Sequence, residues 1–248
     1  MNSYQQGLTG SSRLVLWDFD GTLARRQGLW SGCMLEVLDE QEPGHAIVVE
    51  QIRTAMHQGY PWSRPDEPHL HLCEPEPWWE AMEARMAQAL ADVGIAAGRC
   101  AELAGAARRR LTDPTVGWHV FEDSLPALHA TAAAGWRNAI LSNHIPELAQ
   151  IVDALGLGGS LEAIFSSAVT GYEKPHPDAF QTALRALGEP ADVWMVGDNP
   201  QADVAGAEAL GIPAILVARE GDARARDADA SRRTADLAEA ARVIIGSR

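Results

Sequence analysis

The sequence predicts an α/β protein whose core is a parallel sheet covered by helices on both faces, with an α-helical segment inserted into that core. In the second half of the chain, short apolar segments alternate with helical patterns, as they do in βαβ units. Roughly a hundred residues separate the first apolar segment from this series, which is far more than an ordinary connection between two elements. These residues contain helical patterns. An inserted helical unit accounts for that interval.

Five short segments are expected to form buried strands. Each is apolar, is rich in branched or bulky side chains, and borders a polar or glycine-containing loop. Continuous apolar runs of this length fit parallel strands that are buried on both faces. The segments are residues 14–17, 139–142, 163–166, 193–196 and 214–217.

Helical patterns lie between the later strands, and glycines stand where these helices should end, because glycine readily adopts the left-handed conformation of a helix C-terminus. Pro146 suits a first helical turn. A charged, alanine-rich loop at 221–232 and a last helix at 234–243 are expected to follow. The other predicted helices are 125–134, 146–155, 178–187 and 202–210, with Gly135, Gly156, Gly188 and Gly211 at their ends.

The inserted segment is predicted to be a helical cap. Its position after the first strand would place it over the C-terminal edge of the sheet, where it could act as a lid. We expect a core formed by residues 11–23 and 115–248 and a cap formed by residues 24–114. Within the cap, helical patterns cover residues 30–38, 46–56, 78–93 and 99–111, and a proline-rich stretch covers 59–68.

The composition narrows the class of protein. The chain has 248 residues and a formal net charge of −14, which argues against a nucleic-acid surface. No apolar stretch approaches the roughly 18 residues of a membrane span, and the N-terminus lacks the features of a signal peptide, so a cytoplasmic protein without a membrane partner is expected. The three cysteines form no CxxC pair and are expected to be reduced thiols. The oligomeric state, monomer or homodimer, stays open.

The segment Asp18-Phe19-Asp20-Gly21-Thr22 directly follows the first predicted strand. In open α/β sheets, ligands bind beyond the carboxyl ends of the strands. Two carboxylates placed there repel each other unless a cation neutralises them. The motif therefore indicates a Mg²⁺ site with a carboxylate available as a nucleophile. The alternative is an Asx-type turn in which the acids satisfy loop amides.

Three further polar signals follow later strands. Ser142-Asn143 precedes a helix and could hold phosphate oxygens, or could be a simple N-cap. Lys174 could neutralise phosphate charge, or could be a solvated loop lysine. Gly197-Asp198 allows a tight turn with a hard oxygen ligand, and Asp203 can restrain the lysine or the loop; the alternative is an acidic turn before an N-cap.

The order of these four signals resembles the haloacid dehalogenase-like (HAD) hydrolase superfamily. DxDGT, a serine at a strand end, a lysine and the pattern GDxxxxD match the four motifs of that family, over a Rossmann-like core at about residues 11–23 and 115–220. The helical insertion resembles the first cap type of the family. The resemblance implies a Mg²⁺-dependent phosphatase that hydrolyses a small phosphorylated metabolite through an aspartyl-phosphate.

The resemblance also implies a role for each matching residue. Asp18 would be the nucleophile, and Asp20 the general acid and then the general base. Ser142 and Lys174 match phosphate-binding positions, with Asn143 as a helper, and Lys174 also counts among the catalytic groups. Asp18 and Asp198 would bind Mg²⁺ through their side chains and Asp20 through its backbone carbonyl. The supporting positions are Thr22, Gly197 and Asp203.

Several alternatives stay open at this stage. Dehalogenase members of the superfamily lack an aspartate at the position of Asp20, which favours a phosphatase; a phosphomutase or a catalytically silent binding module is also compatible with the motifs. Phosphoglycolate phosphatases often continue with an acidic residue after DGTL, whereas this chain has Arg25 and Arg26, which could reach an anionic substrate or belong to a solvated linker. Four tryptophans of the cap could form its core or a pocket wall, namely Trp30, Trp62, Trp78 and Trp79.

Overall fold

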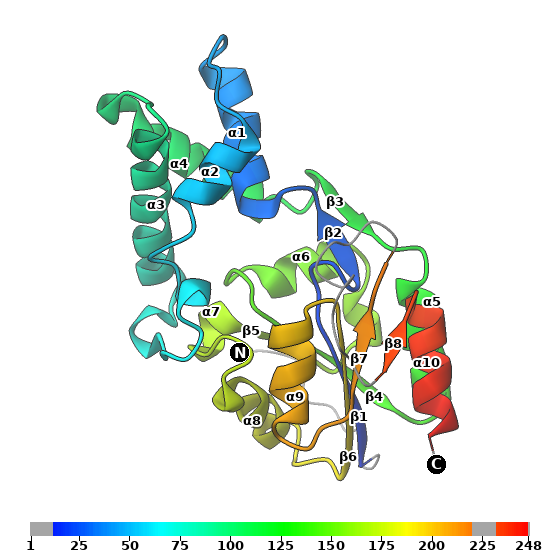
Figure 1. The fold of residues 1–248 in the computed structure, drawn as a ribbon. Helices are drawn as coiled ribbons and strands as arrows, with labels where there is room; N and C mark the ends of the chain where they lie inside the picture. The colour runs from blue at the N-terminus through cyan, green and yellow to red at the C-terminus, as the bar shows by residue number, and fades with distance from the viewer. Residues whose placement is uncertain (1–11, 220–231, 248) are drawn as a thin grey trace.

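A six-stranded parallel sheet forms the centre of the molecule in the computed structural model, which describes residues 12–219 and 232–247 (Figure 1). The strand order is β5-β4-β1-β6-β7-β8, so the first strand lies in the middle of the sheet. The strands are β1 (Arg13–Trp17), β4 (Arg137–Ser142), β5 (Ala163–Ser166), β6 (Asp192–Gly197), β7 (Ala214–Val217) and β8 (Arg233–Thr234).

The register of the central strands brings their carboxyl ends to one edge. Trp17, the last residue of β1, pairs with Ile140 of β4 and with Val196 of β6. The polar residues that follow these strands therefore emerge side by side. All five predicted strands are present in the structure, whereas β8 was not predicted.

Helices cover both faces of the sheet, and β1 shows why. Its side chains alternate, with Val15 and Trp17 buried in one apolar cluster and Leu14 and Leu16 in the other. The first cluster includes residues of α5 (Ser124–Ala133), α6 (Leu148–Ala154) and α10 (Leu237–Gly246), and the second includes residues of α8 (Pro177–Ala186) and α9 (Gly206–Glu208). The predicted α/β fold class is confirmed.

The glycines expected at four helix ends are confirmed, whereas the last helix, expected at 234–243, is α10 (Leu237–Gly246). Gly135, Gly156, Gly188 and Gly211 all have positive φ angles and follow helices, as expected. Pro146 does not open its helix, because α6 begins at Leu148 behind Glu147. The helix expected at 202–210 is instead a π-helical turn (Pro200–Ala205) followed by the short α9. Of the loop predicted at 221–232, all but Arg232 lies outside the described residues.

Four helices of the inserted segment pack against one another beside the sheet (Figure 1). Apolar side chains on these helices, including Trp78 and Trp79, are buried. Short 3₁₀ turns at Pro61–Ser63 and Leu70–Leu72 lie in the connection between the second and third helices. The helices are α1 (Leu29–Gln41), α2 (Val49–Ala55), α3 (Pro75–Asp92) and α4 (Ala97–Thr112).

A two-stranded antiparallel ribbon joins these helices to the sheet. Its strands are β2 (Ala24–Arg26) and β3 (Trp118–Val120), so the two connections of the helical segment lie side by side. Arg26 is not part of a solvated linker: its side chain is buried, and its Nη2 donates to Glu36 Oε2 of α1 at 2.8 Å. Arg25 points to solvent, as alternation along a strand requires. Among the described residues, no helix has the length and apolar character needed to cross a membrane.

Candidate active site

The loop after β1 places Asp18 and Asp20 at the carboxyl edge of the sheet. The Asp18 N–H continues the strand pairing by donating to the Val196 carbonyl at 2.8 Å. Gly21 then turns the chain with a φ of 90°, and a Cβ at this position would lie 2.3 Å from Asp198 Oδ2. Glycine is therefore required here both for the backbone conformation and for the close approach of the Asp198 carboxylate.

Two donors hold one oxygen of the Asp18 carboxylate. Asp18 Oδ1 accepts a hydrogen bond from Ser142 Oγ at 2.8 Å and another from Lys174 Nζ at 2.9 Å. Ser142 ends β4, the neighbour of β1, which explains how a residue far away in sequence reaches Asp18. Both of these bonds end on Oδ1, so the carboxylate is oriented through one oxygen.

Lys174 lies between two carboxylates. Its Nζ donates to Asp18 Oδ1 and, at 2.5 Å, to Asp203 Oδ1. Burial of the 2% exposed side chain acts against its charge, but the Asp18 and Asp203 carboxylates outweigh burial and raise the pKa of Lys174 to about 12. Lys174 is therefore a fixed positive charge at neutral pH.

Asp203 ties the lysine to the loop after β6. Its Oδ1 accepts from Lys174 and its Oδ2 accepts from the Asn199 N–H at 2.9 Å. A Cβ on Gly197 would lie 2.1 Å from Asp203 Oδ2, so glycine lets this carboxylate reach the loop. The sequence left open whether Asp203 restrains the lysine or the loop, and the structure contains both restraints.

Asn143 contacts the main chain of Lys174. Its Nδ2 donates to the Lys174 carbonyl at 2.9 Å, and the Lys174 N–H donates to Asn143 Oδ1 at 2.7 Å. These two bonds engage both ends of the amide. In this arrangement Asn143 positions the lysine, which differs from the direct phosphate contact expected from its place after β4.

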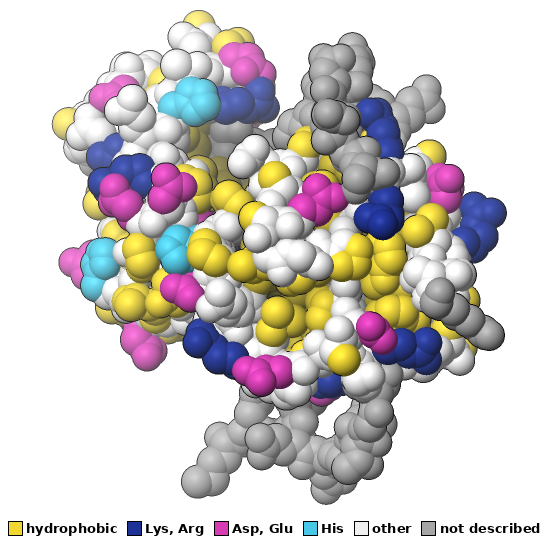
Figure 2. Space-filling view, turned by 60° about the horizontal axis from the view of Figure 1, so that its bottom comes forward, with side chains coloured by type: hydrophobic (Ala, Val, Ile, Leu, Met, Phe, Trp, Pro, Cys, Tyr) yellow, Lys and Arg dark blue, Asp and Glu magenta, His cyan; other side chains and the backbone are white. Residues whose placement is uncertain are grey.

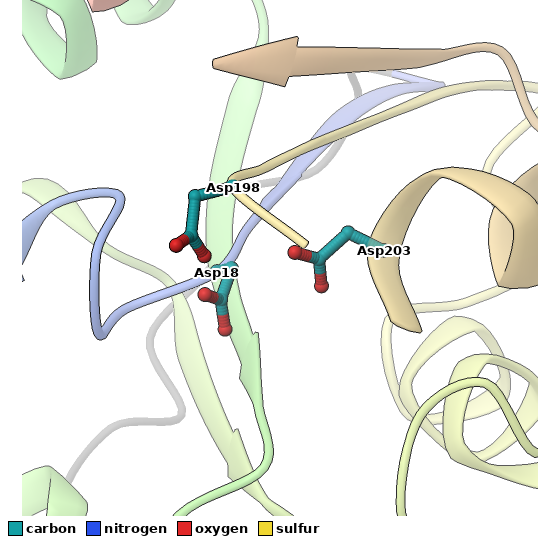
Figure 3. Close-up of side chains that lie close together, drawn as sticks. All are labelled: Asp18, Asp198 and Asp203. Atoms are coloured by element: carbon teal, nitrogen blue, oxygen red, sulfur yellow. The ribbon is translucent and has the colours of Figure 1, made fainter. Parts of the chain in front are cut away.

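Three carboxylates converge at this edge of the sheet and fit a hard divalent cation. Asp18, Asp198 and Asp203 each offer an oxygen within 4.8 Å of the others (Figure 3). Because both oxygens of Asp203 already accept hydrogen bonds, Asp18 and Asp198 are the better placed side-chain ligands. Oxygen donors of this kind suit Mg²⁺.

Most of the residues predicted for the site line one open cavity of about 110 Å³. Thr22 and Gly197 do not line it. Thr22 is buried, and its Oγ1 has no hydrogen-bond partner within the described part of the chain. The predicted residues around the cavity are Asp18, Asp20, Ser142, Asn143, Lys174, Asp198 and Asp203.

A second cavity, of about 220 Å³, lies beside the first, and Asn143 lines both. Sequence reasoning did not identify Glu173 or Trp118, which line it, although Glu173 directly precedes Lys174. His144, next to Asn143, also lines it and is buried. Three of the four tryptophans singled out in the inserted segment, Trp30, Trp62 and Trp78, complete the wall.

Trp79 does not line this cavity. It is fully buried, and its Nε1 donates to the Glu147 carboxylate at 2.9 Å. Both expectations for these tryptophans therefore apply, because Trp79 packs in the interior while its neighbour Trp78 also reaches the cavity. Away from the site, on the face shown in Figure 2, Lys and Arg side chains are dispersed and mixed with Asp and Glu.

Comparison with known proteins places the chain in a family. Residues 13–211 match the sequence profile of a family described as "haloacid dehalogenase-like hydrolase". Haloacid dehalogenase-like hydrolase domain-containing protein 3 of Bos taurus is 28% identical over 213 residues, which cover 83% of this chain and 82% of that protein. Phosphoserine phosphatase of Thermus thermophilus is 36% identical over 160 residues, covering 61% of this chain and 60% of that protein.

Solved structures share the fold. The HAD-hydrolase YfnB of Bacillus subtilis, bound to magnesium, has a TM-score of 0.71 and 18% identity, and the match covers 95% of this chain and 99% of that one. L-2-haloacid dehalogenase of Xanthobacter autotrophicus has a TM-score of 0.66 and 22% identity, covering 95% and 99%. The profile match spans more than half of the sequence, so the chain belongs to the haloacid dehalogenase-like hydrolases.

Proposed function

We propose that this hydrolase is a Mg²⁺-dependent phosphatase that acts on a small phosphorylated metabolite through an aspartyl-phosphate at Asp18. The observation that carries the proposal is the orientation of Asp18. Ser142 and Lys174 hold its Oδ1, and the Asp198 carboxylate lies beside it. A carboxylate held in this way is prepared for in-line attack on phosphorus.

In the first half of the reaction, a carboxylate oxygen of Asp18 forms a bond to phosphorus while the bond to the alcohol oxygen breaks. The alcohol leaves after taking a proton from Asp20, which lines the same cavity. The Lys174 ammonium and the Ser142 hydroxyl stabilise negative charge on the phosphoryl oxygens. Mg²⁺ bound by Asp18, Asp198 and the Asp20 carbonyl would reduce the repulsion between the attacking carboxylate and the phosphate.

In the second half, water attacks the phosphorus of the aspartyl-phosphate. Asp20, now ionised, accepts a proton from this water, the phosphorus–carboxylate bond breaks, and Asp18 is restored with release of inorganic phosphate. Asp203 and Asn143 take no proton. They keep Lys174 in place through its side chain and its main chain, respectively.

We assign residues 24–114 to a cap that covers the leaving group. Tryptophans of this segment and residues next to Asn143 and Lys174 line the same cavity, so the segment closes one side of the site. The two adjoining cavities, of about 110 and 220 Å³, suit a small metabolite.

Relatives of this chain include both phosphatases and dehalogenases, and Asp20 separates the two chemistries. A halide leaves without a proton, whereas an alkoxide needs one, so an acid at Asp20 serves phosphate ester cleavage. We expect release of inorganic phosphate from phosphate esters and no release of chloride from 2-chloropropionate. A phosphomutase would instead convert a hexose 1-phosphate into its isomer, and a silent binding module would show neither product.

The deciding experiment compares Asp18→Asn with Asp192→Asn in a phosphate-release assay with Mg²⁺ over a panel of small phosphate esters. Asp192 is an exposed carboxylate at the other end of β6 and serves as the matched control. We expect Asp18→Asn to lose at least about 1,000-fold in kcat, and Asp192→Asn to stay within about twofold of the unmodified protein. Comparable activity of the two variants would falsify the role of Asp18.

A further inference from the structure

The cavity beside the phosphate site is walled by indole rings. Trp30 comes from α1, Trp62 from the 3₁₀ turn after α2, Trp78 from α3 and Trp118 from β3. The ring centroid of Trp30 lies 5.0 Å from that of Trp62 and 5.7 Å from that of Trp78. Four separate elements therefore contribute indole rings to the wall of one cavity.

One carboxylate enters this aromatic cavity. Glu173 lines it, is 2% exposed, and has no hydrogen-bond partner at Oε2 within the described part of the chain. A buried acceptor without a partner is costly, which points to a ligand that supplies the missing donor or charge. Glu173 is the only Asp, Glu, Lys or Arg among the described residues that line the cavity.

The neighbouring histidines do not supply a positive charge to Glu173 at neutral pH. Burial lowers the pKa of His144 to about 4, so this neighbouring imidazole is uncharged at neutral pH. His69 Nε2 lies 3.8 Å from Glu173 Oε1, and burial also lowers the pKa of His69. Burial raises the pKa of Glu173 more than the charge of Lys174 lowers it, and the Lys174 ammonium donates to Asp18 and Asp203.

We infer that the aromatic cavity binds a cationic leaving group, namely an alkylammonium that a short chain joins to the phosphate. This inference rests on the proposed phosphatase function. Indole faces attract an ammonium group through their negative quadrupole, most strongly when the ammonium carries methyl groups and is weakly hydrated. Burial raises the pKa of Glu173 to about 7, and a cation beside it favours the ionised form, which then supplies the opposite charge.

The two ends of such a substrate would lie in adjoining cavities. Lys174 lines the phosphate cavity and Glu173, one position earlier, lines the aromatic cavity. Asn143 lines both cavities, so a short chain between the phosphate and the cation fits this arrangement. A leaving group with its own carboxylate or second phosphate would meet Glu173 without a balancing cation, and a neutral alkyl group would leave Glu173 unpaired.

The test compares two esters of the same shape and different charge, phosphocholine and 3,3-dimethylbutyl phosphate. With Mg²⁺, we expect kcat/KM for phosphocholine to exceed that for the neutral ester by about tenfold or more. Glu173→Gln should abolish most of this preference by raising KM for phosphocholine, and should leave the neutral ester within about twofold. Glu162→Gln, a control carboxylate paired with Arg137 on the outside of the core, should keep the preference.

A binding measurement separates this inference from the proposed function. Choline is titrated into Mg²⁺-free protein while tryptophan fluorescence is recorded, and we expect a saturable change. The affinity for choline should fall at least about tenfold in Glu173→Gln and in Trp62→Leu but not in Glu162→Gln. Hydrolysis of both esters at equal rates, without choline binding, overturns the cationic leaving group and leaves the phosphatase standing. Choline binding that depends on Glu173, without hydrolysis of any phosphate ester, supports the cation site and overturns the phosphatase.

Discussion

The Asn143 side chain and the Lys174 main chain exchange two hydrogen bonds, one in each direction, at 2.9 and 2.7 Å. The pair joins the ends of two segments that are far apart in sequence, and it sets where the Lys174 side chain begins. The Lys174 side chain then extends to Asp18 and Asp203 from a fixed main-chain position. Placement of the ammonium thus depends on a residue that takes no part in the chemistry.

Asn143→Ala should therefore impair catalysis through Lys174. We expect kcat/KM for phosphate esters to fall roughly 10- to 100-fold, because a displaced ammonium no longer meets the phosphoryl oxygens. The matched control is Asn138→Ala. Asn138 is another buried amide, and its Nδ2 donates to the main-chain carbonyl of Leu128, but it lies at the start of β4, away from the site. Steady-state kinetics and thermal unfolding are measured for both variants.

Asn138→Ala should lose stability and keep its activity per folded molecule, whereas Asn143→Ala should lose activity even where it is fully folded. Equal activities of the two variants at a temperature where both are folded would contradict the positioning role of Asn143.

Gly21→Ala should weaken Mg²⁺ binding. The new Cβ would lie 2.3 Å from Asp198 Oδ2, so this carboxylate must leave its present position in the site. Gly44→Ala is a close control, because Gly44 has a φ of 92°, almost the same as that of Gly21, but nothing lies within 4 Å of its added Cβ. Both variants carry backbone strain of about 1 kcal/mol. We expect at least a tenfold rise in the Mg²⁺ concentration for half-maximal activity in Gly21→Ala alone; an equal rise in both would show that strain, and not the carboxylate, is responsible.

Local patterns were sufficient to predict the strands that position the site. The central strands are apolar runs buried on both faces, and the residues after them were expected to converge because parallel strands end at one edge. β8 was missed because its two residues, Arg233 and Thr234, carry no apolar pattern. The β2–β3 ribbon was missed for a similar reason, since each strand has three residues and β2 contains Arg25 and Arg26.

Tertiary contacts decided the features that could not be predicted. Arg26 looks like a linker residue until its partner Glu36 on α1 is known. The surroundings of Glu173 depend on the inserted helices, because their tryptophans help to wall a cavity that no single segment forms. No spacing in the sequence reports such a contact between distant segments.

Mg²⁺ should stabilise the folded protein by binding between Asp18 and Asp198. At a concentration about 100 times its dissociation constant, a ligand of the native state adds about 2.7 kcal/mol, which for a chain of this size raises Tm by roughly 5–10 °C. Asp198→Asn should lose most of this increase, and Asp192→Asn should retain it. Thermal unfolding is followed with EDTA and with excess Mg²⁺; an undiminished increase in Asp198→Asn would place the cation elsewhere.

Glu173 should make the protein less stable as the pH rises. Burial raises the pKa of this carboxyl from 4.5 to about 7, against the opposing effects of the Ser167 hydroxyl and the Lys174 ammonium. The native state therefore holds this proton more tightly than the unfolded chain, and the free energy of unfolding falls between about pH 4.5 and pH 7. Glutamine cannot ionise, so Glu173→Gln should become more stable than the unmodified protein across this interval, by up to roughly 3 kcal/mol at pH 8.

The measurement is the difference in unfolding free energy between Glu173→Gln and the unmodified protein from pH 4.5 to pH 8, with Glu162→Gln as the control for the loss of a carboxylate. A tenfold difference in proton affinity between the native and unfolded states corresponds to about 1.4 kcal/mol, so the difference between the two proteins should grow through the interval and level off above pH 7. Glu162→Gln should show no such growth, because Glu162 is paired with Arg137 near the surface. If the difference in unfolding free energy for Glu173→Gln did not change with pH, the buried carboxyl would have the same pKa in the native and unfolded states. Its burial would then not favour a cationic partner.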